Sequence, residues 1–231
     1  MLKFGHARRG WLGVRIQPVT DDIAENLGLD KARGALVAGL SEGGPAQKAK
    51  IEPGDIIVSF DGKPVPEMRV LPRIVAETPI GKDVQVEVWR KGQMQKLHVT
   101  VAELKETEEA VVTADAKTKG KGKSKGDTDS SKSVDELGLV LSAITPELRQ
   151  KFDLKPDAKG VVITDVRPDS VAASKDIHPG DVIVEVAQSE VENPDDVIGK
   201  VKEQEKAKRK SVLFLLRRSD ELRFIAVPFK G

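Results

Sequence analysis

Short stretches in which apolar and polar residues alternate recur along the chain, and turn residues separate them. In residues 84–90, Val-Gln-Val-Glu-Val-Trp-Arg, every second side chain up to position 88 is apolar, as in a strand with one buried face. Residues 12–16 show the same period. In the first half of the chain, this pattern predicts strands at residues 11–17, 35–40, 55–60, 84–90 and 97–101.

The segments between these strands carry helix start and stop signals. Thr20 or Asp21 is the predicted N-cap of a short helix that ends at Gly28. A second short helix is expected after the loop at residues 43–45. A third is expected at residues 71–76, where Pro72 fits the first turn because the N–H that proline lacks has no helical partner there.

A long internal repeat organises the chain into two copies of one domain. Residues 34–37 recur 126 residues later at 160–163, and residues 46–58 align without a gap on 172–184. A solenoid repeat has a period of only about 20–50 residues. The repeat therefore indicates two domains of about 95 residues each, a common domain size.

The second copy is expected to repeat the elements of the first. Its counterpart of the helix at 71–76 begins near Asn193 and Pro194, and its last strands are predicted at residues 212–217 and 222–229. The predicted boundaries are a remnant of an upstream connection at 1–10, domain one at 11–103, a linker at 104–133 and domain two at 134–231.

The predicted linker differs in composition from both copies. Residues 104–133 lack apolar periodicity and are rich in Gly, Ser, Lys and Asp, so the segment is expected to be disordered. A flexible tether of this length has a mean span of about 30 Å. The two domains are therefore expected to reorient rather than hold one fixed pose.

Composition narrows the function classes. Of 231 residues, 39% are apolar and 3% aromatic, so the two cores must be built from Val, Ile and Leu. The formal net charge of +1 gives no global field that favours nucleic acid or a membrane. Cysteine is absent, which excludes disulfides and thiolate chemistry. No apolar run approaches the roughly 20 residues of a membrane span, and the first residues contain no apolar signal region.

An ordered series of motifs carries a family resemblance. The series comprises a glycine-containing loop at residues 9–14, Gly-Gly-Pro-Ala at 43–46, and Pro-Gly-Asp followed by branched apolar residues at 53–58 and again at 179–184. It resembles PDZ domains, and specifically the tandem pair that follows the protease in the Do/HtrA (DegP/DegQ-like) family of serine endoproteases. The resemblance covers nearly the whole chain outside the linker.

The resemblance implies both a fold and a role. The implied fold is α+β, mainly β, with each PDZ domain a small, partly open antiparallel β-barrel or sandwich with two helices. The implied role is that of a regulatory, substrate-binding module of a periplasmic protease in protein quality control. Its partners would be C-terminal or unfolded protein segments, an upstream protease domain and neighbouring subunits of a homo-oligomer.

In the first copy, the resemblance and the residue chemistry together predict a peptide groove. A terminal carboxylate needs several backbone N–H groups at one spot, which a glycine-containing turn provides. The predicted carboxylate-binding residues are Leu12, Gly13, Val14 and Arg9, with Arg9 adding a positive field. The predicted groove residues are Ile16, Leu71, Ile74 and Val75. The alternative, which stays open here, is that the apolar members are core; Trp11 is interpreted as a cover beside the loop.

The second copy departs from this pattern. The weak counterpart of the loop comprises Leu137, Gly138 and Leu139, and Asp135 and Glu136 precede it. Each of these two carboxylates would repel an incoming carboxylate by about 1 kcal/mol at an effective dielectric of about 20 and a separation larger than direct contact. The second copy is therefore expected to bind peptide ends weakly or not at all, and to serve mainly in contacts between domains and subunits.

No catalytic or metal site is predicted from the residues. The three histidines, His6, His98 and His178, lie apart in the sequence, and no serine stands in a nucleophile-elbow motif. No cofactor, metal or nucleic-acid site is expected, although the resemblance implies that the chain is a piece of a serine endopeptidase. Two hypotheses remain: a peptide-binding regulatory module, or a structural assembly module with little affinity for free peptide.

Overall fold

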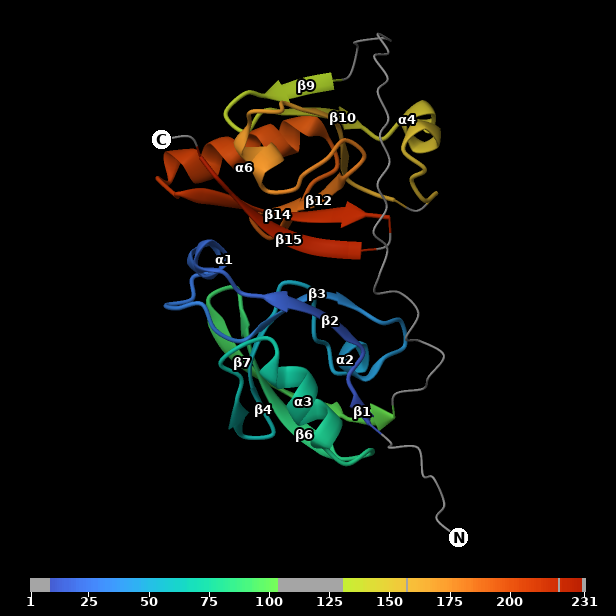
Figure 1. Ribbon diagram of the computed structural model, residues 1–231, viewed down its shortest axis with the longest axis vertical. Helices are drawn as coiled ribbons and strands as arrows, with labels where there is room; N and C mark the ends of the chain where they lie inside the picture. The colour runs from blue at the N-terminus through green and yellow to red at the C-terminus, as the bar shows by residue number, and fades with distance from the viewer. Residues whose placement is uncertain (1–8, 104–130, 157, 220, 230–231) are drawn as a thin grey trace.

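The computed structural model describes residues 9–103, 131–156, 158–219 and 221–229, which form two α+β domains (Figure 1). Most of the predicted linker, and residues 1–8 of the predicted N-terminal remnant, lie outside the described residues. Residues 131–133, which composition assigns to the linker, instead belong to a strand of the second domain. Composition misplaced this boundary because main-chain pairing stabilises these three residues, whose side chains are exposed.

The first domain is mainly β. In chain order its elements are β1 (Gly10–Trp11), β2 (Val14–Pro18), α1 (Asp21–Asn26), β3 (Ala35–Leu40), α2 (Pro45–Lys48), β4 (Ile56–Phe60), β5 (Lys63–Pro64), α3 (Val70–Glu77), β6 (Asp83–Arg90), β7 (Gln93–Thr100) and β8 (Ala102–Glu103). The single strand expected at residues 11–17 is split at Leu12 and Gly13. The reason is that Gly13 has φ +72°, a left-handed conformation that ends the strand.

The second domain repeats this order. Its elements are β9 (Ser131–Val134), β10 (Leu139–Ala143), α4 (Pro146–Lys151), β11 (Val161–Val166), α5 (Val171–Ser174), β12 (Val182–Val186), β13 (Ser189–Glu190), α6 (Pro194–Lys206), β14 (Ser211–Arg218) and β15 (Glu221–Pro228). Asn193 caps α6 and forms a reciprocal capping box with Asp196, which confirms the predicted start of this helix.

The main sheets of the two domains correspond strand by strand, with one addition in the second, and β1 and β8 of the first domain form a separate two-stranded sheet. The order is β2-β3-β4-β6-β7 in the first domain and β15-β14-β12-β11-β10-β9 in the second, with β5 and β13 attached to β4 and β12. Neighbouring strands are antiparallel, and neither sheet closes into a barrel. The α+β fold class is confirmed. Among the described residues each domain has three helices, one more than the family resemblance implies.

The buried aspartate of each Pro-Gly-Asp turn is hydrogen-bonded to an arginine of a neighbouring strand. Arg90 of β6 donates from Nε and Nη2 to the two carboxylate oxygens of Asp55, each at 2.6 Å. In the second copy Arg218 of β14 donates to Asp181 at 2.6 and 2.8 Å. Both aspartates are 1% exposed. The recurrence of this motif therefore has a structural cause.

The two domains contact each other through an apolar cluster, and burial of this cluster would oppose the free reorientation expected from the composition of the linker. Figure 1 shows α1 and β3 of the first domain against the β14–β15 hairpin of the second. The first domain contributes Ile23, Ala24, Leu27, Leu29, Leu36 and Ile56, and the second contributes Leu213, Leu215, Phe224 and Ala226. Burial of this apolar surface favours one relative pose.

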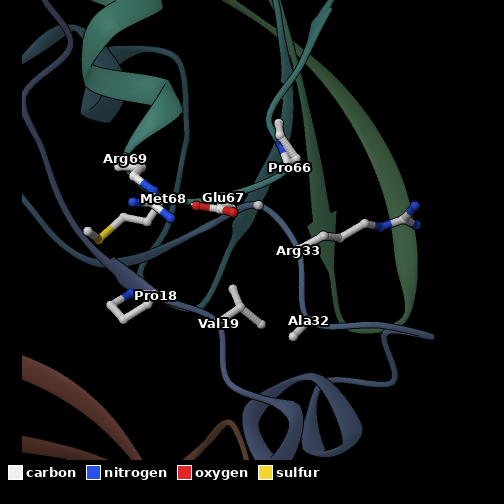
Figure 2. A pocket seen from close by; sticks show the side chains of 9 residues that line it. Pro18, Val19, Ala32, Arg33, Pro66, Glu67, Met68 and Arg69 are labelled. Carbon is white, nitrogen blue, oxygen red and sulfur yellow. Dashed lines mark hydrogen bonds and ion pairs between the residues drawn. The ribbon is translucent and has the colours of Figure 1, made fainter.

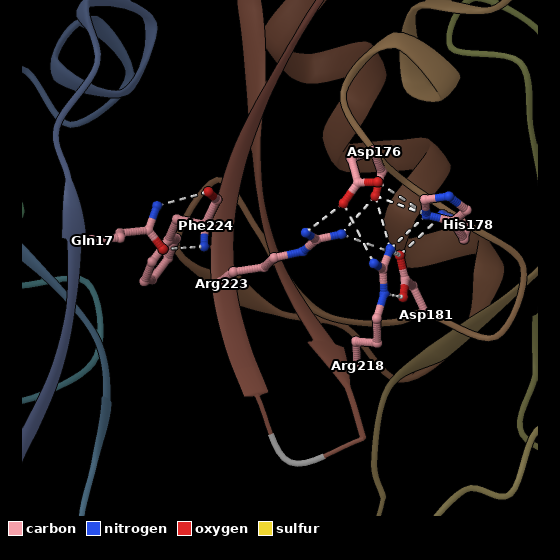
Figure 3. Close-up of polar contacts among 7 residues, drawn as sticks. All are labelled: Gln17, Asp176, His178, Asp181, Arg218, Arg223 and Phe224. Carbon is pink, nitrogen blue, oxygen red and sulfur yellow. Dashed lines mark hydrogen bonds and ion pairs between the residues drawn. The ribbon is translucent and has the colours of Figure 1, made fainter. Parts of the chain in front are cut away.

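Polar contacts at the edge of this cluster fix its register. The side-chain amide of Gln17 accepts a hydrogen bond from the Phe224 N–H at 2.8 Å and donates to the Phe224 carbonyl at 2.9 Å (Figure 3). Asn26 donates to the Ser211 hydroxyl at 2.6 Å. Because Gln17 bonds the backbone as a neighbouring strand would, it extends the contact from β2 to β15.

Opposed carboxylates in the second domain give a prediction on pH and stability. Glu185 of β12 lies directly opposite Glu190 of β13, and burial, followed by the charge of Glu190, raises the pKa of Glu185. An acid whose pKa is raised by folding destabilises the domain above that pKa, and the penalty disappears as the pH falls below its unfolded value. Glu185→Gln is therefore expected to raise the unfolding temperature at pH 7 by a few degrees and to leave it nearly unchanged near pH 4.

Differential scanning calorimetry of the two proteins at pH 7 and pH 4 measures this difference. Glu192→Gln is the matched control, because Glu192 is exposed and has no opposed carboxylate in the strand register. An equal gain from Glu185→Gln at both pH values would contradict the assignment of the penalty to the ionised form of Glu185.

None of the helices in the described part of the chain has the length and apolar character that a membrane span requires.

Candidate peptide-binding groove

An unpaired strand edge and a helix form a groove on the first domain. Strand β2 ends the sheet order and, among the described strands, pairs only with β3, so its other edge keeps main-chain groups available. A groove of about 280 Å³ lies between this edge and α3. Its lining residues are Arg9, Gly10, Trp11, Leu12, Gly13, Val14, Ile16, Leu71, Pro72, Val75 and Ala76.

The loop between β1 and β2 closes one end of the groove. The carbonyls of its two residues are both engaged: Ala46 N–H donates to Leu12 O and Ser41 N–H donates to Gly13 O, each at 2.9 Å. Within the described residues, the N–H groups of Leu12 and Gly13 donate to no acceptor. Two adjacent amides without acceptors, next to an apolar groove, form a site suited to an anionic oxygen.

Glycine is required on both sides of this loop for steric reasons. A Cβ on Gly10 would lie 2.2 Å from the Val75 carbonyl oxygen, so only glycine lets the loop approach α3 so closely. Gly13 has φ +72°, and a Cβ there would lie 3.2 Å from the Trp11 ring. Trp11 is half-buried and lies beside the loop, in keeping with its interpretation as a cover.

The structure gathers seven of the eight residues predicted for the first copy. Arg9, Leu12, Gly13, Val14, Ile16, Leu71 and Val75 all line the groove. Leu12 and Leu71 are fully buried at its floor, whereas Val14 and Ile16 are half-buried. Ile74 does not line the groove; it packs in the core cluster of the domain beneath α3. The same cluster contains Leu12, Leu71 and Val75, so these three side chains belong both to the core and to the groove lining, whereas Ile74 belongs to the core alone.

Of the four lining residues that were not among the predicted site residues, Gly10 and Trp11 belong to β1, and Pro72 and Ala76 belong to α3. Pro72 and Ala76 lie four positions apart on α3 and share one helical face. That spacing was visible in the sequence, but proline and alanine are less hydrophobic than Leu71 and Val75 and so do not mark a groove as clearly. Together they place the rim of the groove one residue further along the helix than predicted.

The loop of the second domain has the same internal ties. Arg167 N–H donates to Gly138 O at 2.9 Å and Ala172 N–H donates to Leu137 O at 3.4 Å, at positions that match Ser41 and Ala46. Here, however, the amides of Leu137 and Gly138 already donate to the carbonyl of Val134, at 3.2 and 2.9 Å. Leu139 is 1% exposed. The predicted weak site therefore exists as a loop whose amides are occupied.

The charges near the second loop are less repulsive than the sequence indicates. Asp135 forms an ion pair with Arg167, whose position relative to the loop was not apparent from the sequence. Glu136 is exposed and lines a shallow pocket at the loop. Only one of the two carboxylates thus stands without a cationic partner among the described residues.

A hollow near the other end of β2 lacks the features of a binding site. It has a volume of about 340 Å³, and Figure 2 shows side chains from β2 and the segments at residues 32–34 and 66–69 around it. Its two arginines, Arg33 and Arg69, are paired with Asp30 and Glu67. Because these charges are satisfied by neighbours on the same segment, no polar groups converge on a ligand.

Comparison with known proteins supplies the family context. A PDZ domain family model matches residues 10–101, and a second PDZ domain model matches residues 128–210. A protein described as a probable periplasmic serine endoprotease DegP-like, from Brucella suis biovar 1 (strain 1330), is 38% identical over 228 residues. These residues make up 99% of this chain and 41% of that protein.

A relative with the same description from Rhizobium meliloti (strain 1021) is 36% identical over 232 residues, covering 99% of this chain and 42% of that protein. The chain therefore spans about two fifths of the length of these relatives. Among solved structures, the HtrA-type protease AlgW with a decapeptide is similar at 35% identity, with a TM-score of 0.41 and coverage of 45% of this chain and 32% of that one.

Proposed function

Because the chain belongs to the PDZ family, we propose that its first domain captures the C-terminal ends of extended polypeptides. The chain is a pair of PDZ domains, homologous to the PDZ region of DegP-like periplasmic serine endoproteases. The observation that carries this proposal is the pair of amides at Leu12 and Gly13, which lack acceptors among the described residues and lie at the end of an open strand edge.

The groove offers both parts of a β-augmentation site. An extended peptide can pair its main chain with the free edge of β2, which provides affinity without reading sequence. Its last side chain would lie on Leu12 and Leu71, between Val14 and Val75, so an apolar residue is favoured. Its carboxylate would accept from the loop amides, and the exposed Arg9 at the rim adds a positive charge.

For the second domain we propose a role in contacts between domains. The hairpin β14–β15 presents Leu213, Leu215 and Phe224 to the first domain, where they are buried in the apolar cluster. This observation supports a structural function beside the peptide-binding one. A purely structural role for both domains is less well supported, because it leaves the groove of the first domain without a use.

The wider role follows from the relatives. They are named periplasmic serine endoproteases, and we propose that this chain is the substrate-binding, regulatory part of such an endoprotease, located in the periplasm. In that setting an upstream protease domain and neighbouring subunits of a homo-oligomer would be its partners, and captured unfolded proteins its substrates in protein quality control.

The test compares a short peptide ending in valine as the free acid and as the C-terminal amide. Charge-assisted hydrogen bonds contribute roughly 1.5–3 kcal/mol, so the acid is expected to bind at least about 10-fold more tightly. Fluorescence polarisation of the labelled peptide measures both dissociation constants. Equal affinity of the two forms would contradict carboxylate capture.

A matched pair of glycine variants localises the binding. Gly13→Val is expected to weaken binding of the acid about 10-fold or more, because the side chain crowds Trp11 and strains the loop. Gly62→Val is the control: Gly62 has φ +73° and nothing within 4 Å of its ideal Cβ, so it carries similar strain away from the groove. An equal loss of affinity in both variants would argue against this site.

A further inference from the structure

Among the described residues, strand β9 has no counterpart in the first domain. It pairs antiparallel with the outer edge of β10, with Val134 opposite Leu139 and Lys132 opposite Leu141. In the described part of the first domain the matching edge is that of β2, which has no such partner there. The chain therefore supplies, within the second domain, the additional strand that a bound peptide would supply in the first (Figure 1).

The carbonyl of Val134 occupies the anion-binding position of the loop. It accepts from Leu137 N–H and Gly138 N–H, the two amides that correspond to the unpartnered amides of Leu12 and Gly13. A peptide that ended at Val134 would place its carboxylate at this position. Val134 thus has the main-chain contacts of the last residue of a ligand.

The side chain of Val134 also takes the place of a ligand side chain. It is 3% exposed and packs in the core cluster that contains Val197 and Val201 of α6. By the repeat of 126 residues these two positions correspond to Leu71 and Val75 of the open groove. Leu139 and Leu141 are fully buried, whereas their counterparts Val14 and Ile16 are half-buried. Strand β9 therefore covers the apolar surface that stays open in the first domain.

A charge pair fixes the other end of the strand. Lys132 Nζ lies 2.5 Å from Asp195 Oδ1, in the first turn of α6. The strand is thereby held at three places: by the loop through the Val134 carbonyl, by the core through the Val134 side chain, and by the helix through Lys132. Neighbouring Ser131 and Ser133 are exposed and add only main-chain pairing.

We propose that residues 131–134 are an intrachain ligand of the second domain, with Val134 in the position of a captured terminal residue, and that they keep this groove closed to peptides in trans. The inference rests on the proposed peptide-binding role of the homologous groove. It replaces charge repulsion by occupancy as the main reason for the weak binding of peptide ends that is expected of the second domain.

The chemistry of the loop suits this occupant. An internal carbonyl carries only a partial negative charge, so it avoids the repulsion that a carboxylate would meet from Glu136. The first loop has Arg9 and no acidic residue at the corresponding place. The ligand class of the second groove is therefore an internal extended segment with a branched apolar residue, rather than a free C-terminus.

The experiment opens the groove and offers a peptide in trans. The full chain and the variant Val134→Asp are titrated with the peptide Ser-Ser-Lys-Ser-Val, as the C-terminal amide and as the acid, and backbone amides are followed by NMR. A carboxylate at position 134 cannot stay in the apolar core, so the strand is expected to leave. Ser131→Asp is the control, because it adds the same charge at an exposed position of the same strand.

In Val134→Asp the amide peptide is expected to shift the backbone amide NMR signals of Leu137 and Gly138. Its affinity should be at least about 10-fold above that for the parent chain, because only a small open fraction of the parent chain can bind. In Ser131→Asp and the parent chain these residues should respond only at peptide concentrations at least about 10-fold higher. The same titration reports the proposed function separately, through acid-dependent shifts at Leu12 and Gly13.

Two results would overturn the inference. One is a folded Val134→Asp variant in which neither peptide shifts Leu137 or Gly138. The other is a parent chain in which both residues respond as strongly as in the variant. If Val134→Asp unfolds the second domain, judged by loss of the Phe224 amide signal, Val134→Ala is titrated instead, because it removes side-chain contacts only. An increase in peptide affinity of about 3-fold or more over the parent chain supports the inference, whereas no increase contradicts it.

Discussion

Replacing Asp55 with alanine is expected to unfold the first domain under conditions in which the parent chain is folded. The Asp55 carboxylate is buried, accepts two hydrogen bonds from Arg90, and accepts a third from the Glu52 N–H at 2.9 Å. Removing it leaves the guanidinium, whose side chain is 16% exposed, without its main partner. Breaking a buried pair from one side costs about 3–5 kcal/mol, so the unfolding temperature of this domain should fall by more than about 10 °C.

The repeat provides a matched variant for this prediction. Asp181→Ala removes the same interaction from the second domain, where Asp181 also accepts from the His178 N–H at 3.0 Å. Figure 3 shows that Arg218 and Arg223 there also contact Asp176, so Arg218 keeps one carboxylate partner, as Arg90 keeps Glu52 in the first domain. The loss is therefore expected to be similar to that for Asp55→Ala. Residue-resolved thermal melts by NMR measure both, and a loss below about 1 kcal/mol in Asp55→Ala would contradict this account of the Pro-Gly-Asp motif.

The variant Phe224→Asp is expected to separate the two domains while each stays folded. Phe224 is 4% exposed, and its side chain lies in the cluster between the domains rather than in the core of its own domain. Loss of the aromatic contact costs about 3 kcal/mol or more. The ratio of packed to separated molecules should therefore fall more than about 100-fold.

Small-angle X-ray scattering and amide relaxation measure this separation. The radius of gyration should increase, and the two domains should tumble with different correlation times. Ile80→Asp serves as the control, because Ile80 is an exposed apolar residue outside the cluster. Unchanged scattering in a folded Phe224→Asp variant would contradict the view that this cluster fixes the relative pose.

A continuous apolar run in the sequence indicates the contact between the domains, although a search for alternating apolar and polar residues does not detect it. Residues 84–88 of β6 alternate cleanly, as a strand with one buried face does, whereas residues 212–216 of β14 are all apolar. In the structure Val212, Phe214 and Leu216 face the domain core, and Leu213 and Leu215 face the first domain. A continuous apolar run indicates a strand buried on both faces, and here the second face is covered by the other domain.

The open groove was predictable because its chemistry depends on local residue types. The family resemblance, which the comparisons confirm, and the placement of Gly13 beside Leu12 and Val14 identified the loop. Glycine is needed at Gly10 and Gly13 for steric reasons that act within a few residues. The face of α3 followed from helical spacing, except for Ile74, whose direction depends on how the helix packs.

The covered groove was not predictable by the same reasoning. Ser-Lys-Ser-Val at 131–134 has the composition of the linker before it, and three of its four side chains are exposed. Its strand is stabilised by main-chain pairing with β10 and by one buried valine, which leave little trace in composition. The ion pair of Asp135 with Arg167 joins residues 32 positions apart, so it also required the fold.

Hydrogen exchange of the two loop glycines tests the central claim, that the same amides are open in the first domain and occupied in the second. In the ligand-free chain the Gly138 amide, bonded to Val134, is expected to exchange at least about 10-fold more slowly than the Gly13 amide. Addition of a peptide acid ending in valine should slow Gly13 and leave Gly138 unchanged. Equal exchange of the two amides without peptide, or slowing of both by the acid, would contradict the account.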